Sequence, residues 1–228
     1  MRRPYVLINV AATVDGKIDT LERRGAAISS DRDRERVDAL RASVDAVMVG
    51  GRTLLDEDPR LTLRSPKLRG ERVARGEREH PAKVGVVSRL ALQPDCRFLT
   101  AGPSRVILFI PCGRPQEEVK PLRDRGVEIY ATGESRVDLV SALAKLAELG
   151  MRRLLVEGGG TLNFELLRLG LVDEVQVFIA PLIFGGATSP TLADGGGLAR
   201  NLALQLRRRQ ADTWEDGGVL LRYIVERT

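Results

Sequence analysis

The sequence predicts an α/β fold in which a mostly parallel sheet carries helices on both faces and ends in antiparallel strands. Short aliphatic runs, such as residues 45–50 and 154–156, are typical of strands buried on both faces, and helical patterns alternate with them. After Gly170 the alternation stops, because residues 202–209 and 219–225 have strand patterns with no obvious helix between them. This order of elements favours parallel strands first and antiparallel strands last.

The N-terminal part should begin with a strand at residues 5–10, followed by a turn at Asp15-Gly16. Ser29 or Ser30 can cap the next helix, because a serine hydroxyl accepts a hydrogen bond from an amide of the first turn. One apolar face of this helix is formed by Val37, Leu40 and Val44.

After the strand at residues 45–50, a short helix is expected up to Pro59. Residues 65–81 are charged and poor in apolar groups, which predicts a surface loop with an exposed His80. Further strands are expected at residues 83–88, 106–110, 127–130 and 173–180, and helices at residues 116–125 and 137–149.

The stretch around residues 154–170 is the most informative for function. The strand at 154–156 stops at Glu157 and three glycines, and a helix that Thr161 can cap should run from there to Gly170. A ligand can approach bare backbone amides at such a helix N-terminus, where anions are favoured. The motif indicates a phosphate cradle, and the alternative is a tight turn whose glycines only satisfy backbone geometry.

Composition narrows the class of ligand. Aromatic residues make up only 4% of the chain, which argues against a stacking platform for single-stranded nucleic acid. The net charge of +5 arises from 36 basic and 31 acidic residues that are mixed along the chain. An anionic small molecule is therefore favoured over nucleic acid as the partner.

The number and spacing of cysteines and histidines argue against two further kinds of functional site. Cys96 and Cys112 form no C-x-x-C motif, and there is one histidine, so neither a metal site nor a Ser-His triad is expected. The cysteines are expected to be free thiols in a reducing cytosol. No signal peptide or apolar span of membrane length is visible, which predicts a cytoplasmic protein with no membrane contact. One domain, residues 1–228, is the simplest organisation.

The segment from Thr53 to Arg64 adds chemical groups. Thr53 and Glu57 are four residues apart and so share one face of a short helix, while Arg64 follows the helix end. A carboxylate can serve in proton transfer or bind hydroxyls, and a guanidinium can hold a phosphate through two hydrogen bonds. Arg41 is a second candidate for the phosphate. The alternative is an acidic helix end with its proline stop, and a solvated arginine.

These residues resemble the riboflavin-biosynthesis reductases, which include stand-alone archaeal and fungal enzymes and the C-terminal domain of the bacterial bifunctional deaminase-reductase. The resemblance implies a dihydrofolate-reductase-like fold and spans nearly the whole chain. The matching segments are residues 9–17 (NVAATVDGK), 40–50 (LRASVDAVMVG), 53–64 (TLLDEDPRLTLR), 88–90 (SRL), 156–162 (VEGGGTL) and 171–186 (LVDEVQVFIAPLIFGG).

The resemblance implies an NADPH-dependent reductase of the diaminopyrimidinone ribosylamino phosphate, with NADH as the alternative cofactor. The residues that would contact the cofactor are Ala11, Thr53, Glu57, Ser88, Gly159, Gly160, Thr161 and Leu162. Arg89 is added on physical grounds as a partner for the 2′-phosphate of the cofactor. The residues that would contact the substrate are Asn9, Arg41, Leu61, Arg64 and Glu157. Glu57 is the expected catalytic group.

Two positions depart from parts of this family. Glu57 stands where the family usually has aspartate, and Asn9 stands where the bacterial bifunctional enzymes carry lysine. Asparagine is the archaeal and fungal choice, which favours reduction before deamination. Reduction of the deaminated uracil or of a pterin-like substrate, and non-catalytic nucleotide binding, remain as alternatives. The family also implies a homodimer.

Overall fold

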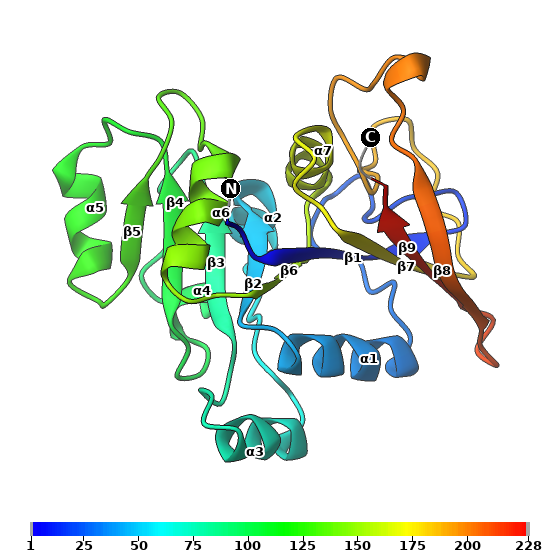
Figure 1. Ribbon diagram of the computed structural model, residues 1–228, viewed down its shortest axis with the longest axis horizontal. Helices are drawn as coiled ribbons and strands as arrows, with labels where there is room; N and C mark the ends of the chain where they lie inside the picture. Colours follow the sequence, from blue (N-terminus) through cyan, green and yellow to red (C-terminus); the bar gives the residue numbers. More distant parts are fainter. Residues whose placement is uncertain (1, 227–228) are drawn as a thin grey trace. The chain divides into compact units, whose positions relative to one another are not determined.

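The computed structural model describes residues 2–226 and groups them into two compact units. The first unit holds the residues up to Pro4 together with Val37–Leu155, and the second holds Tyr5–Arg36 together with the residues from Val156 onward. Figure 1 draws the chain from blue at its N-terminal end to red at its C-terminal end. The expectation of a single domain stays a prediction.

A parallel sheet forms the centre of the first unit. Its strand order is β5-β4-β3-β2-β6, with bounds Glu128–Ala131, Val106–Ile110, Ala82–Val86, Ala46–Gly50 and Arg153–Val156. The pairs β2–β3, β3–β4 and β4–β5 are parallel, and Gly50 lies opposite Val86. Met48, Val84 and Leu108 are fully buried, as side chains of a sheet covered on both faces should be. The prediction from the aliphatic runs is confirmed.

Helices precede or connect these strands along the chain. They are α1 (Asp31–Ala42), α2 (Gly51–Glu57), α3 (Pro66–Ala74), α4 (Arg97–Thr100), α5 (Gln116–Arg123) and α6 (Leu139–Glu148). The predicted serine cap of α1 is confirmed, because the Ser30 hydroxyl accepts a hydrogen bond from the Asp33 amide at 3.2 Å. Among residues 2–226, no helix is both long enough and apolar enough to cross a lipid bilayer.

The second unit contains the antiparallel part of the fold. Its strand order is β1-β7-β9-β8, with bounds Tyr5–Thr13, Glu174–Ala180, Val219–Val225 and Leu206–Thr213. β1 and β7 are parallel, whereas β7–β9 and β9–β8 are antiparallel, and Figure 1 shows β7, β9 and β8 side by side. The predicted antiparallel C-terminal strands are therefore confirmed. A stacked pair, Phe178 and Trp214, packs with Leu220 in the core of this unit, at 5.1 Å between ring centroids.

The charged stretch before β3 contains helix α3, which corrects the expectation of a surface loop. The Ser65 hydroxyl accepts a hydrogen bond from the amide of Leu68, and Pro66 stands at the start of the helix, where proline is favoured. The inner face is held by Arg72, which is 4% exposed and donates to the carbonyl oxygens of Ala42 and Val44 at 3.0 and 2.9 Å. The stretch was expected to be a loop because it lacks the apolar stripe of a typical surface helix. In the structure, the buried arginine forms the inner face of the helix instead.

Candidate functional site

The ends of β2 and β3 bring small residues close together. A Cβ atom at Gly51 would lie 3.3 Å from the carbonyl oxygen of Val86, so the start of α2 packs tightly against the end of β3. Thr53, the third residue of α2, is buried, while Ser88 and Arg89 are exposed just beyond β3. The first unit therefore places these candidate cofactor residues at the carboxyl ends of adjacent parallel strands, where α/β sheets bind ligands.

Glu57 is the last residue of α2, and its backbone is anchored from α4. Arg97 donates from Nη2 to the Glu57 carbonyl oxygen at 2.7 Å. The Asp58 carboxylate accepts hydrogen bonds from the amides of Arg97 and Phe98 at 2.8 and 2.9 Å. Burial opposes ionisation of Asp58, but these amides outweigh it and lower the pKa of the carboxyl. The carboxylate that follows Glu57 thus fixes the end of α2.

A buried lysine binds carbonyl oxygens at the C-terminal end of α4. Lys83 on β3 is 0% exposed, and its Nζ donates to the carbonyl oxygens of Phe98 at 2.9 Å and Ala101. Burial lowers the pKa of Lys83 to about 8. Nothing in the sequence indicates this role, because an aliphatic strand gives no sign that a lysine within it has carbonyl partners.

The candidate phosphate residues lie on one short loop and on the helix beside it. Arg41 donates from Nη1 to the Thr62 carbonyl oxygen at 3.1 Å. The Asp38 carboxylate accepts hydrogen bonds from the amides of Arg64 and Ser65, each at 2.8 Å. The structure therefore brings Arg41 of α1 to the segment that carries Leu61 and Arg64. Leu61 is buried, whereas Arg64 is exposed.

His80 is buried, which corrects the expectation that it faces solvent. Its exposed fraction is 4%, and its Nδ1 accepts a hydrogen bond from the Leu63 amide at 3.2 Å. A Cβ atom at Gly102 would lie 2.8 Å from the imidazole ring, so the ring fills the space beside this glycine. Burial lowers the pKa of His80 and favours the neutral ring. The charged residues around it in the sequence had predicted an exposed side chain.

In the second unit, Asn9 lies in the middle of β1 and is buried. Its Oδ1 accepts a hydrogen bond from Arg36 Nη2 at 2.7 Å, so its Nδ2 group points away from Arg36. Arg36 also donates to Gln176 on β7 and to Asp33, at 2.8 Å in both cases. Ala11 follows Asn9 on the same face of the strand and is half-buried.

The glycine turn between β6 and α7 (Gly160–Arg168) is the segment predicted to form a phosphate cradle. Gly158 has φ +103°, and a Cβ atom there would meet open space. Gly159 caps the helix without a side-chain hydrogen bond, and a Cβ atom at Gly160 would lie 2.4 Å from the Thr191 carbonyl oxygen. The amides of the first helical turn have no acceptor within the helix and point out of its N-terminus. Open amides of this kind are what a phosphate cradle requires, and the cradle stays a prediction.

The expectation that Thr161 caps α7 is wrong. Gly159 occupies the cap position, and Thr161 is the exposed second residue of the helix. A cap without a side chain leaves the first-turn amides open to a ligand oxygen, which a threonine cap would have satisfied itself. Leu162 is buried and Glu157 is half-buried at the end of β6.

The candidate residues are divided between the two units. The first unit holds Arg41, Thr53, Glu57, Leu61, Arg64, Ser88 and Arg89, and the second holds Asn9, Ala11, Glu157, Gly159, Gly160, Thr161 and Leu162.

The fold of this chain, an α/β fold with a mostly parallel sheet, is shared with a solved protein. A crystal structure of a pyrimidine reductase-like protein from Corynebacterium diphtheriae matches it with a TM-score of 0.84 and 21% identity, over 99% of this chain and 93% of that chain. At this identity the match shows a shared fold.

The RibD C-terminal domain model matches residues 4–220, and the chain belongs to that family. A relative from Archaeoglobus fulgidus is 42% identical over 85% of this chain and 87% of its own length. A relative from Methanothermobacter thermautotrophicus is 41% identical over 90% of this chain and 92% of its own. Both relatives are named 2,5-diamino-6-ribosylamino-4(3H)-pyrimidinone 5′-phosphate reductase.

Proposed function

We propose that this protein reduces the ribosyl side chain of 2,5-diamino-6-(5-phosphoribosylamino)pyrimidin-4(3H)-one to the ribityl form in riboflavin biosynthesis, with NADPH as the reductant. The observation that carries the proposal is the 42% and 41% identity, over most of both chains, to two relatives named as reductases of this compound. The glycine cradle and the arginine-bearing loop supply the groups that a dinucleotide and a sugar phosphate require.

In this reaction the C1′–O4′ bond of the ribose opens to a protonated C1′=N imine whose nitrogen keeps its hydrogen, O4′ takes up a proton, and a hydride adds to C1′ to give the secondary amine. NADPH supplies the hydride from C4 of its nicotinamide ring when it is bound. Glu57 positions or protonates the opening sugar oxygen, because it is a carboxylate with an anchored backbone at the end of α2. The protein's further contribution is to orient the two carbon atoms and exclude water.

The remaining candidate residues bind the two ligands. Arg41 and Arg64 hold the substrate phosphate, and Leu61 packs beside it. Asn9 and Glu157 hydrogen-bond the polar groups of the pyrimidine and the sugar. The cofactor is bound by Ala11, Thr53, Ser88, Gly159, Gly160, Thr161 and Leu162, and Arg89 pairs with its 2′-phosphate. This last pairing is the reason for proposing NADPH over NADH.

Turnover measured by the loss of NADPH absorbance tests the proposal directly. We expect oxidation of NADPH with the diaminopyrimidinone phosphate and much slower oxidation with its deaminated uracil counterpart or with NADH. Preference for the uracil would move the enzyme to the step after deamination and would make Asn9→Lys the next variant to compare. NADPH binding without turnover of either compound would contradict the proposed reaction.

We also propose that the protein works as a homodimer in the cytoplasm, where the free Cys96 and Cys112 stay reduced. Edge strand β8 is exposed along most of its length; its first residue, Leu206, is 44% exposed, and Leu202 in the 3-10 turn before it is 60% exposed. An edge with this much apolar exposure favours a protein partner, and a second copy is the partner available to every molecule.

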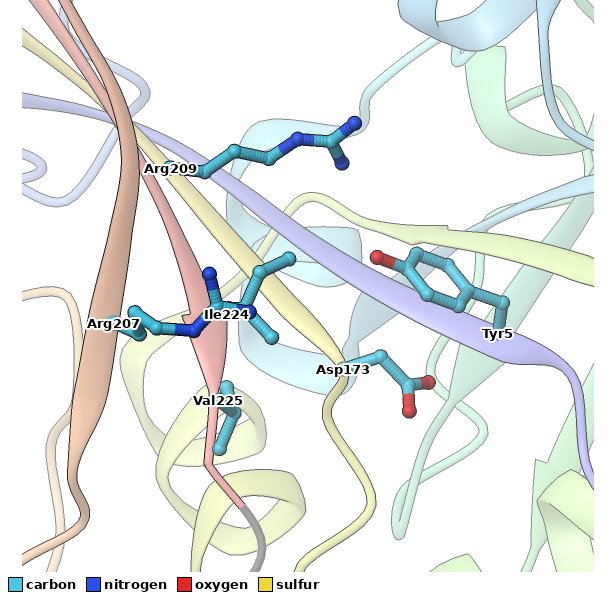
Figure 2. Close-up of a pocket in the computed structure, with 6 residues that line it drawn as sticks. All are labelled: Tyr5, Asp173, Arg207, Arg209, Ile224 and Val225. Atoms are coloured by element: carbon cyan, nitrogen blue, oxygen red, sulfur yellow. The ribbon is translucent and has the colours of Figure 1, made fainter.

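The surface beside strands β8 and β9 also contains a pocket, which is lined by both acidic and basic side chains. The pocket there has a volume of about 450 Å³. Figure 2 shows Arg207 and Arg209 of β8 across from Asp173 and Tyr5. None of the candidate cofactor or substrate residues lines this pocket. Opposite charges on one surface suit self-association, because two copies can then meet with complementary charge.

Sedimentation equilibrium tests the homodimer. We expect a mass of twice 25.0 kDa for the wild type and a shift towards 25.0 kDa for the double variant Leu202→Glu/Leu206→Glu, because the new carboxylates would be buried between the copies. Val73→Glu is the matched control, since Val73 is 58% exposed on α3. A monomeric wild type at micromolar concentration would contradict this part of the proposal.

A further inference from the structure

We propose that His80 is a positioning residue for the substrate phosphate, which it holds in place indirectly by fixing the Leu63 amide of the loop that carries Arg64. This inference rests on the proposed function and adds to it a residue that touches neither substrate nor cofactor.

The loop at residues 61–65 is held by hydrogen bonds at four consecutive positions. Arg41 binds the carbonyl oxygen of Thr62 at 3.1 Å, His80 accepts from the Leu63 amide at 3.2 Å, and Asp38 accepts from the next two amides at 2.8 Å each. A loop with this many fixed backbone groups has one conformation. The direction in which it presents the Arg64 side chain is therefore set by its partners.

His80 supplies the contact at the centre of this set. Leu61 and Leu63 are 1% and 2% exposed, so the loop is seated in the core on both sides of Thr62. Leu61 has φ +52°, a conformation that a leucine rarely adopts without support from its surroundings. Without the acceptor, a buried Leu63 amide would lose its partner, and the loop would shift until it found another.

The contact requires a neutral imidazole ring. Nδ1 can accept a hydrogen bond only when it carries no proton, so protonation would place two donors face to face. The charged groups that face the ring are Glu79, Arg69, Arg72 and Lys83. Arg69 pairs with Glu79 at 3.0 Å, Arg72 pairs with Glu77 at 3.0 Å, and Lys83 binds carbonyl oxygens. Because three of the four groups are cations, they disfavour a positive charge on the imidazole ring.

Two variants of His80 separate positioning from simple packing. His80→Asn keeps an acceptor, since Oδ1 of asparagine takes the place of Nδ1, whereas His80→Leu keeps the volume and removes the acceptor. For His80→Leu we expect a fivefold to tenfold rise in KM for the phosphorylated substrate, roughly the effect of one buried hydrogen bond, with kcat and the Kd for NADPH changed by less than about twofold. His80→Asn should restore the wild-type KM.

The same measurements with the substrate that lacks its 5′-phosphate identify the group concerned. If His80 acts through the phosphate loop, His80→Leu should leave KM for this compound unchanged. An equal rise for both compounds, or no rise for either, would overturn the inference. Arg105→Met is the matched control for reduced stability, because it breaks the two contacts between Arg105, which precedes β4, and Glu128 on β5 of the same unit.

The pH dependence provides an independent readout. Burial lowers the pKa of His80 below its ordinary value of 6.5, so the neutral ring is present above that pH and is lost as pH falls through the lowered value. We expect the wild-type KM to rise on acidification more steeply than that of His80→Asn. The comparison cancels ionisation of the substrate phosphate, which is common to both enzymes. Identical profiles would contradict the role of His80.

Failure of the proposed function gives a different pattern. In that case the wild type itself would not oxidise NADPH with the phosphorylated substrate, whatever stands at position 80. Calorimetric titration with the phosphorylated pyrimidine then replaces KM, and unchanged affinity in His80→Leu would overturn the inference on its own.

Discussion

Glu57→Gln is expected to lower kcat by about 10²–10⁴-fold, the range typical of losing a general acid or base, while the Kd for NADPH stays close to that of the wild type. The amide keeps the length and shape of the side chain but can neither carry nor deliver a proton. The backbone of the residue should not move, because Arg97 binds its carbonyl oxygen at 2.7 Å and the neighbouring Asp58 fixes the end of α2. Single-turnover and steady-state NADPH oxidation measure the effect.

Two further variants define what is lost. Glu57→Asp keeps the carboxylate, shortens it by one methylene and recreates the aspartate of the resembling family, so it should retain much more activity than the amide. Asp56→Asn removes a charge from the preceding, exposed position and should leave kcat unchanged. If Asp56→Asn lowered kcat as much as Glu57→Gln, the effect would come from local charge and Glu57 would not be the catalytic group.

Much of the sheet could be predicted because its strands depend on local patterns. The strand β2 is a run of buried aliphatic residues, and β9 was bounded at the same residues, Val219–Val225, in sequence and structure. Helix α3 was missed because its buried face is provided by Arg72, whose partners are carbonyl oxygens roughly thirty residues away in the chain. No periodicity in a charged stretch reports such contacts.

In the candidate site, too, some features follow from local sequence patterns and others depend on contacts between distant residues. The glycine turn could be recognised because three consecutive glycines after a buried strand have few structural explanations. The support of the phosphate loop could not, because Asp38 resembles any solvated carboxylate of a helix and His80 resembles any charged-loop histidine. Their partners, the amides of Leu63 and Arg64, are 17 and 26 residues distant. Only the folded chain shows that these polar groups are buried and occupied.

Arg64→Ala is expected to raise KM for the phosphorylated substrate tenfold to a hundredfold with little change in kcat, since a charge-assisted hydrogen-bonded pair contributes about 1.5–3 kcal/mol. The loop should keep its conformation in this variant, because Asp38 binds the Arg64 amide and not its side chain. The measurement is steady-state kinetics at fixed ionic strength, with thermal unfolding to show that stability is unchanged.

The matched control is Arg60→Ala, which removes the same charge from an exposed neighbouring position. It should leave KM near the wild-type value, because long-range attraction between exposed charges is screened by salt. Arg64→Lys should lie between the two, since an ammonium keeps the charge but loses the paired donors of the guanidinium. Equal effects of Arg60→Ala and Arg64→Ala would remove Arg64 from the phosphate site. An effect of Arg64→Ala that persists with the substrate lacking its phosphate would assign the side chain to another part of the ligand.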